Sequence, residues 1–194
     1  MRTTYLVIFA CSLFVGCAAK QEPVTPELEV KKQPVTFFPV TTFIKGQIFV
    51  LDSLPITPLL ITTQKGKVDS LWLPAGKTKP YLQPFLEPTI TETNFLDLFR
   101  ETRFNDQTIN AITFTYDPSV TLPDSLSLRH WDVYVDPEKS TVSKVYILKE
   151  FIKDGENITQ QLTWQTGKYA KIATIVTRAG QAELLKEELI TWDF

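Results

Sequence analysis

The fold is decided by residues 157–181, which read NITQQLTWQTGKYAKIATIVTRAGQ. Ile158, Leu162 and Trp164 lie at even positions, whereas threonine and glutamine fill the odd ones. A period of two is typical of a β-strand with one buried face. Two glycines, one in each turn, bracket the next segment, residues 169–177. The stretch therefore predicts antiparallel strands joined by short turns.

The same kind of pattern continues on both sides of this stretch. Further strands are predicted at 59–63, 68–73, 112–116, 133–135 and 142–151, each next to turn residues. Residues 182–194 fit either a helix, because AELLKEEL has helical composition, or a strand, because the chain ends in ELITWDF. We expect a strand, since the preceding turn favours a hairpin.

Two helices are expected before most of the strands. Residues 37–53 carry apolar side chains at three- and four-residue steps, and Pro39 sits where a first helical turn tolerates it. Gly46 and several β-branched residues oppose this helix. A short helix is expected at 76–86 and a helical turn at 95–99. We therefore predict an α+β fold: a curved antiparallel sheet of about seven to nine strands, packed against an N-terminal amphipathic helix and a second short helix.

Composition excludes several kinds of functional site. The chain has 194 residues, with 20 Lys and Arg against 22 Asp and Glu. One His, two Cys within the first seventeen residues and seven dispersed Gly are incompatible with a multi-histidine metal site, a disulfide framework and a glycine-rich phosphate loop. The slightly acidic balance argues against a nucleic-acid partner. We expect no metal, no cofactor and no nucleic acid.

The N-terminus has the features of a signal peptide. Residues 5–15, YLVIFACSLFV, are eleven residues without a charge. A bilayer span takes about 20 residues, whereas this length suits the apolar region of a signal peptide. The FVGCA segment that follows resembles the lipobox of bacterial lipoproteins, except that Phe14 stands where Leu is usual. The resemblance implies cleavage between Gly16 and Cys17 and attachment of fatty acids such as palmitate, through a diacylglycerol on the Cys17 sulfur.

This resemblance divides the chain into three parts. Residues 1–16 would be the signal peptide, 17–35 the lipidated Cys17 with an extended tether, and 36–194 a single α+β domain. The tether is expected because its 18 residues after Cys17 contain three Pro and six charges and no aromatic residue. Alternatives are a plain secretory signal with an incidental Cys, and an uncleaved anchor.

The resemblance also implies a location. The chain would be anchored by lipid in a bacterial cell envelope, with the membrane as its first partner. Ala18 follows Cys17 where sorting in enterobacterial lipoproteins would place Asp for the inner membrane, so the outer membrane is favoured. Whether the domain faces the periplasm or the cell surface stays open.

Aromatic residues are the remaining signal of function. They are either core residues, since aromatic side chains dominate core burial, or the lining of an apolar groove between the first helix and the curved sheet. The candidates for such a groove are Phe38, Phe43, Trp131 and Trp164. A groove of this kind would take a lipid chain or a partner peptide.

Catalytic chemistry is not indicated. His130 is the only possible histidine base, and its neighbours Asp132, Ser125 and Ser127 are close in sequence at the entry of a strand, which is not the arrangement of a triad. Carboxylates are present, as in any domain, without a pattern that marks a catalytic pair. We expect no catalytic residue and no enzyme activity.

Two segments, FPVTTFIKGQ (38–47) and WQTGK (164–168), are similar to stretches of uncharacterised lipoproteins of Bacteroidota-type bacteria. That resemblance brings no known activity with it. The leading hypothesis is a non-enzymatic, lipid-anchored domain that binds an envelope protein or a wall component. The alternatives are a lipid or lipoprotein carrier with an apolar groove under the first helix, and an envelope hydrolase.

Overall fold

A computed structural model describes residues 36–192 of the chain. Gly16, Cys17 and the expected tether lie outside the described residues. The described residues belong to one compact unit. Among the described helices, none combines the length and the apolar character that a membrane crossing takes.

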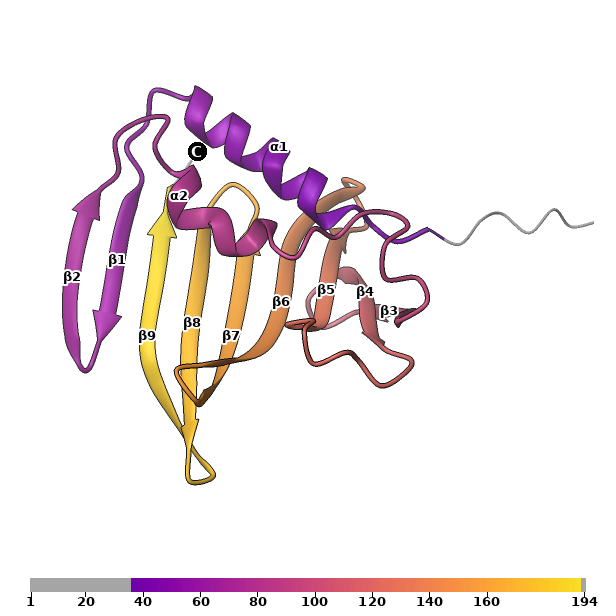
Figure 1. Cartoon of the computed structure of the whole chain (residues 1–194). Coiled ribbons are helices and arrows are strands. Elements are labelled where there is room, and N and C mark those ends of the chain that lie inside the picture. Colours follow the sequence, from indigo (N-terminus) through magenta and orange to yellow (C-terminus); the bar gives the residue numbers. More distant parts are fainter. Residues whose placement is uncertain (1–35, 193–194) are drawn as a thin grey trace, which may run out of the picture. The chain divides into compact units, whose positions relative to one another are not determined.

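In the described residues, nine antiparallel strands form one open sheet (Figure 1). The strands are β1 Leu59–Gln64, β2 Lys67–Trp72, β3 Phe99–Asp106, β4 Ala111–Pro118, β5 Leu128–Asp136, β6 Thr141–Lys153, β7 Glu156–Gln165, β8 Tyr169–Arg178 and β9 Gln181–Thr191. Their order is β2-β1-β9-β8-β7-β6-β5-β4-β3, so β2 and β3 are the two edges. The number of strands and their antiparallel pairing confirm the sheet that the sequence predicts.

Residues 157–181 form most of β7, all of β8 and the first residue of β9. Leu162 pairs with Ile172 and Trp164 with Ala170 across β7 and β8, and all four side chains are buried on the same face. Residues 181–191 are a strand, as expected, and this strand pairs with β8 on one side. On its other side β9 pairs with β1, which brings Leu60 opposite Ile190.

The helical part is smaller than predicted. Helix α1 covers Val40–Ser53, α2 covers Lys79–Leu82, and one 3-10 turn, η1, covers Gln83–Leu86. Helix α1 begins three residues later than predicted because Phe37 is held in the preceding segment, where its N–H donates to the Glu92 carbonyl at 2.9 Å. Residues 36–192 contain one 14-residue helix and two single turns beside nine strands. This part of the chain is mostly β, and the α+β prediction is confirmed only in part.

One strand was not predicted. The turn expected at 95–99 is closed by hydrogen bonds from the Leu98 and Phe99 N–H groups to the Phe95 carbonyl, at 3.0 and 2.9 Å, but Phe99 already opens strand β3. The β3 sequence, FRETRFND, has no apolar alternation because most of its side chains are exposed at the edge of the sheet. An edge strand with no buried face lacks the pattern by which strands are found.

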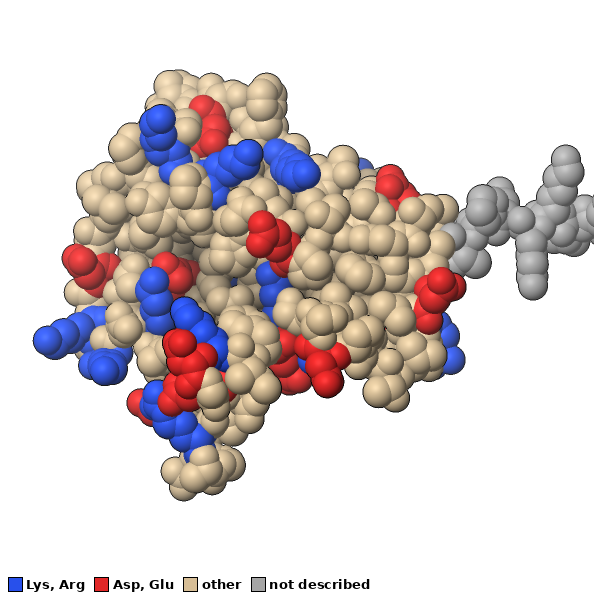
Figure 2. Space-filling model, viewed as in Figure 1, with Lys and Arg blue, Asp and Glu red and all other residues tan. Residues whose placement is uncertain are grey.

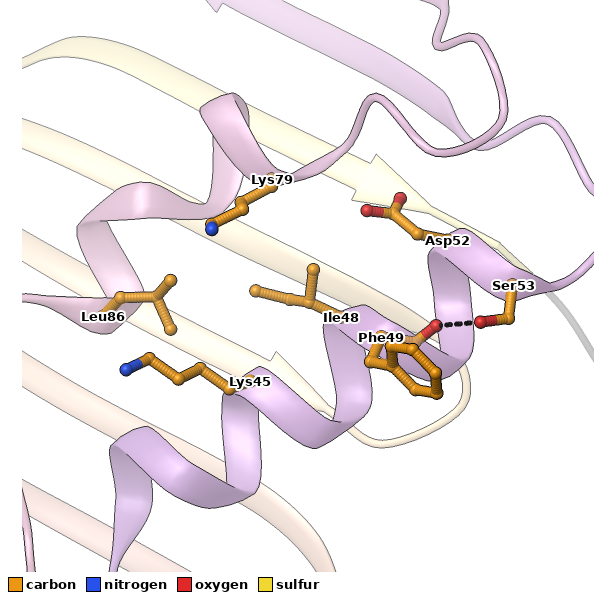
Figure 3. A pocket seen from close by; sticks show the side chains of 7 residues that line it. All are labelled: Lys45, Ile48, Phe49, Asp52, Ser53, Lys79 and Leu86. Atoms are coloured by element: carbon orange, nitrogen blue, oxygen red, sulfur yellow. Dashed lines mark hydrogen bonds between the residues drawn. The ribbon is translucent and has the colours of Figure 1, made fainter.

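Both helical segments lie on the same side of the sheet (Figures 1 and 3). The buried face of α1 consists of Val40, Thr41, Ile44, Ile48 and Leu51. Its apolar members join one core with the buried side chains of the sheet and with Leu82, Phe85 and Leu86 of α2 and η1. The opposite face of α1 is left exposed, and this exposed face borders the candidate site.

Candidate functional site

A pocket of about 500 Å³ lies between α1 and the α2–η1 segment (Figure 3). Its lining residues are Lys45, Ile48, Phe49, Asp52, Ser53, Lys79 and Leu86. Five of the seven come from α1 at three- and four-residue steps, which places them along one side of the helix. The other two come from the two ends of the α2–η1 segment.

The base of the pocket is apolar and well supported. Ile48 and Leu86 are each only 5% exposed, and both belong to the hydrophobic core. Phe49 differs, because its side chain is 74% exposed. The pocket thus has a fixed apolar base and an exposed aromatic side chain beside it.

Charge is distributed unevenly around this base. Within residues 36–192, neither Lys45 nor Lys79 takes part in an ion pair. Figure 3 shows both ammonium groups directed toward the side of the pocket where Leu86 lies, and the Asp52 carboxylate at the other end. Figure 2 shows basic side chains over the part of the surface where α1 and α2 lie in Figure 1.

Asp52 has a structural task that accounts for its orientation. Its Oδ1 accepts hydrogen bonds from the Thr78 hydroxyl at 2.6 Å and from the Thr78 N–H at 3.3 Å. These bonds join the end of α1 to the start of α2. The turn before Thr78 contains Gly76 at a φ of +71°, a conformation that side-chain-bearing residues rarely adopt. The spacing between the two walls of the pocket is therefore fixed by specific contacts.

The four aromatic residues predicted to line a groove lie in three places. Trp131 is fully buried and stacks on Tyr116, with ring centroids 4.6 Å apart. Trp164, also fully buried, packs against Phe85 and Trp192. Both indole N–H groups lack a hydrogen-bond partner in the described structure, so the rings contribute apolar contact only. At these two positions core packing fills the space that a groove would need.

Phe38 and Phe43 form a separate pair at the start of α1. Their rings meet edge to face at 5.7 Å, and both are partly buried against the core. Phe38 also borders a second hollow with Glu92, Glu101 and Phe114. The pair is accessible, but the structure does not join it with Trp131 and Trp164 into one continuous groove.

His130 lies on the other face of the sheet from the helices, between two carboxylates. Its Nδ1 is 2.7 Å from Asp117 Oδ1 and its Nε2 is 3.0 Å from Asp132 Oδ2. The hydrogen bond with Asp132 raises the pKa of His130 to about 9, Asp117 adds to this, and partial burial opposes it. The imidazole is thus protonated at neutral pH and has both nitrogens engaged, so it is a poor general base. The sequence pointed to Asp132 as a neighbour but did not reveal Asp117.

Lys149 is a buried base that the sequence analysis missed. Only 5% of the residue is exposed, and its ammonium group contacts the Pro84 carbonyl. Burial lowers the pKa of Lys149 to about 8. It borders an open cleft of about 740 Å³ with Phe151 and Gln160. The sequence could have indicated this burial. Lys149 lies two and four residues after Ile147 and Val145, so the alternation of a strand places it with them on the buried face of β6.

Comparisons of this chain with models of protein families, with curated proteins and with solved structures find no match. Within the part of the chain that the structure describes, there is no group of three or more His, Cys, Asp or Glu side chains placed to hold a metal ion.

Proposed function

We propose that this chain is a lipid-anchored protein of the bacterial cell envelope whose folded part binds a partner without chemical conversion. The observation that carries the binding function is the pocket between α1 and α2–η1, whose base is rigid and whose two lysines are unpaired within the described residues. Concave sites with an apolar base and a few polar groups are the usual form of binding sites. The partner is an envelope protein or a wall component.

The chemistry around His130 supports a non-enzymatic role. A hydrolase of this composition would use the one histidine as its base, yet two carboxylates keep that histidine protonated. Its partners on both ring nitrogens are acids, so neither nitrogen is left to activate a serine hydroxyl. An ion-pair network that stabilises β4 and β5 explains the cluster without catalysis.

The carrier alternative requires an empty apolar space under the first helix. Trp131 and Trp164 fill the positions that would have lined it. A carrier would instead need the more open pocket beside α1, which is small for a ligand with several acyl chains. We therefore favour the binding domain.

The anchor is tested by labelling cells with radioactive palmitate. We expect label on the wild-type chain and none on a Cys17→Ala variant, because only a thiolate at the lipobox position forms the thioether. Cys11→Ala is the matched control and keeps the label, since Cys11 lies within the segment that is removed. Label that persists in the Cys17→Ala variant would refute the anchor. Fractionation of the labelled membranes then tests the preference for the outer membrane.

Partner binding is tested by placing a photoreactive phenylalanine analogue at Phe49, beside the pocket. The control carries the analogue at Phe104 on edge strand β3, where the side chain is 60% exposed against 74% at Phe49. After irradiation of intact cells, we expect a discrete adduct from position 49 that position 104 does not give. Equal and diffuse labelling at both positions would contradict a binding site at α1.

A further inference from the structure

We propose that the pocket between α1 and α2–η1 binds an amphiphile with one alkyl chain and an anionic head group. This inference rests on the proposed binding function of the pocket, and it adds to the envelope partner a small ligand that the same pocket binds. The head group lies between Lys45 and Lys79, and the alkyl chain lies on Ile48 and Leu86 next to Phe49.

The position of the ligand's anionic head group follows from the two lysines. They come from different elements, α1 and α2, and Figure 3 shows both ammonium groups directed to the same side of the pocket. The nearby carboxylate of Asp52 accepts two hydrogen bonds from Thr78 and lies at the other end. Two unpaired cations that converge are complementary to a phosphate or a carboxylate.

The position of the ligand's alkyl chain follows from the apolar surface of the pocket. Ile48 and Leu86 form a base that belongs to the core and does not need to move, so little conformational freedom is lost on binding. Phe49 leaves an aromatic ring exposed at the same place. An alkyl chain that covers this ring removes apolar surface from water, which a purely ionic ligand would not do.

The size of the pocket limits the ligand to a small molecule. About 500 Å³ lies within the usual range of small-molecule sites, roughly 300–1,000 Å³. A fatty acid and a single-chain phospholipid share the required chemistry. The two are distinguished by comparing a carboxylate with a phosphate on the same alkyl chain.

Calorimetric titration of the mature protein in phosphatidylcholine nanodiscs tests the proposal, with empty nanodiscs subtracted. The probes are octanoate, octyl phosphate, uncharged octyl glucoside and cationic octyltrimethylammonium, all below their micellar concentrations. We expect at least one of the two anions to bind, and to bind about tenfold more tightly than the other two probes. The tighter anion identifies the head group. Equal binding of all four probes, or no binding of either anion, overturns the proposal.

Variants locate the site. Lys45→Glu combined with Lys79→Glu is expected to weaken binding of the anions about tenfold or more, because the charge of the site is reversed. Lys67→Glu combined with Lys168→Glu makes the same charge change at exposed positions on and near other strands and leaves the affinity unchanged. Both double variants are first checked by circular dichroism. Unchanged affinity in the pocket variant overturns the proposal.

The contact between Phe49 and the ligand's alkyl chain is tested separately, by the dependence of affinity on alkyl chain length. In the wild-type protein octyl phosphate should bind more tightly than butyl phosphate, and Phe49→Ser should reduce this ratio without abolishing binding. If the affinity ratio of octyl to butyl phosphate is unchanged in Phe49→Ser, the alkyl chain does not lie on Phe49 and the proposed position is contradicted. If Phe49 forms an adduct with a protein while neither anion binds, the proposed function holds and this inference fails. If both experiments are negative, both proposals fail.

Discussion

His130 holds a proton between two carboxylates on the open face of the sheet. Both contacts are short, at 2.7 Å to Asp117 and 3.0 Å to Asp132, and they link neighbouring strands β4 and β5. Asp132 is tied further by the Thr115 hydroxyl at 2.6 Å. Burial raises the pKa of Asp132, but the hydrogen bonds from His130 and Thr115 outweigh it and leave that pKa below its usual value. The cluster is thus a structural element whose strength depends on pH.

The pKa of His130 is raised from 6.5 to about 9 in the folded chain, so the protonated imidazole stabilises the fold fully below pH 6.5 as long as Asp132 is ionised. That stability is lost as the pH rises through about 9. We expect His130→Gln to lower the free energy of unfolding by on the order of 2 kcal/mol at pH 6 and by little at pH 10. Urea unfolding of both proteins at the two pH values measures this difference.

A difference between the two proteins that does not change with pH would contradict the role given to His130. The comparison with the variant is essential, because Lys149 titrates in the opposite sense. Its pKa is lowered to about 8 by burial. It therefore makes the fold more stable as the pH rises toward the usual lysine pKa, in both proteins alike.

At the scale of elements, periodicity was predictive where one face of an element is buried, and turn residues were predictive even where no face is. Strand β7 and helix α1 were found by their periodicity, whereas the hairpin around Gly66 was found by its turn, although every residue of β2 is exposed. Strand β3 was missed, because its side chains are mostly exposed and no periodicity results. The candidate pocket was missed for a related reason. Lys45 and Lys79 are ordinary surface lysines in sequence, and only the packing of α2 beside α1 brings them together.

Helix α1 contains a glycine whose removal should be favourable. Gly46 is exposed in the middle of the helix, and a Cβ placed on it meets no atom within 4 Å. Gly46→Ala should stabilise the fold by about 0.5–1 kcal/mol, because alanine loses less backbone freedom in a helix. Calorimetric melting should show a Tm higher by about 1–4 °C.

The matched control is Gly76→Ala, in the turn before α2. There φ is +71°, so the same substitution introduces strain and should lower the melting temperature. If both substitutions shift the melting temperature in the same direction, backbone conformation is not the cause of either effect.

At the scale of the whole molecule, the pairing of β1 with β9 organises the sheet. This pairing joins Leu59 to Thr191 and places β9 between the first hairpin and the six other strands of the described sheet. No local pattern predicts it, because strands distant in sequence are paired by the shared burial of their faces and not by a turn between them. The sheet was therefore predictable as a set of strands, whereas the order of its strands was not.

The seam between β1 and β9, meaning the pairing of residues 59–64 with 186–191, is expected to lose stability when the buried side chain of Ile190 is truncated. Ile190 is 2% exposed and faces Leu60, so Ile190→Ala should cost about 2–4 kcal/mol through lost burial and the cavity it leaves. Leu184, in the same strand, is 49% exposed, and Leu184→Ala should cost less than about 0.5 kcal/mol. Urea unfolding distinguishes the two. Equal losses would show that the seam is not part of the cooperative core.

The same seam sets the time at which the sheet can be completed. Among the nine described strands β1 and β2 are synthesised first, whereas β9, which attaches them to the rest of the sheet, is synthesised last. Pairings between such distant segments form slowly, since a long loop must be closed before the contacts form. Until residue 191 has left the ribosome, the first hairpin has no place in the sheet. For a chain that is destined for the cell envelope, as proposed above, the order of synthesis would thereby leave the sheet incomplete until β9 has been made.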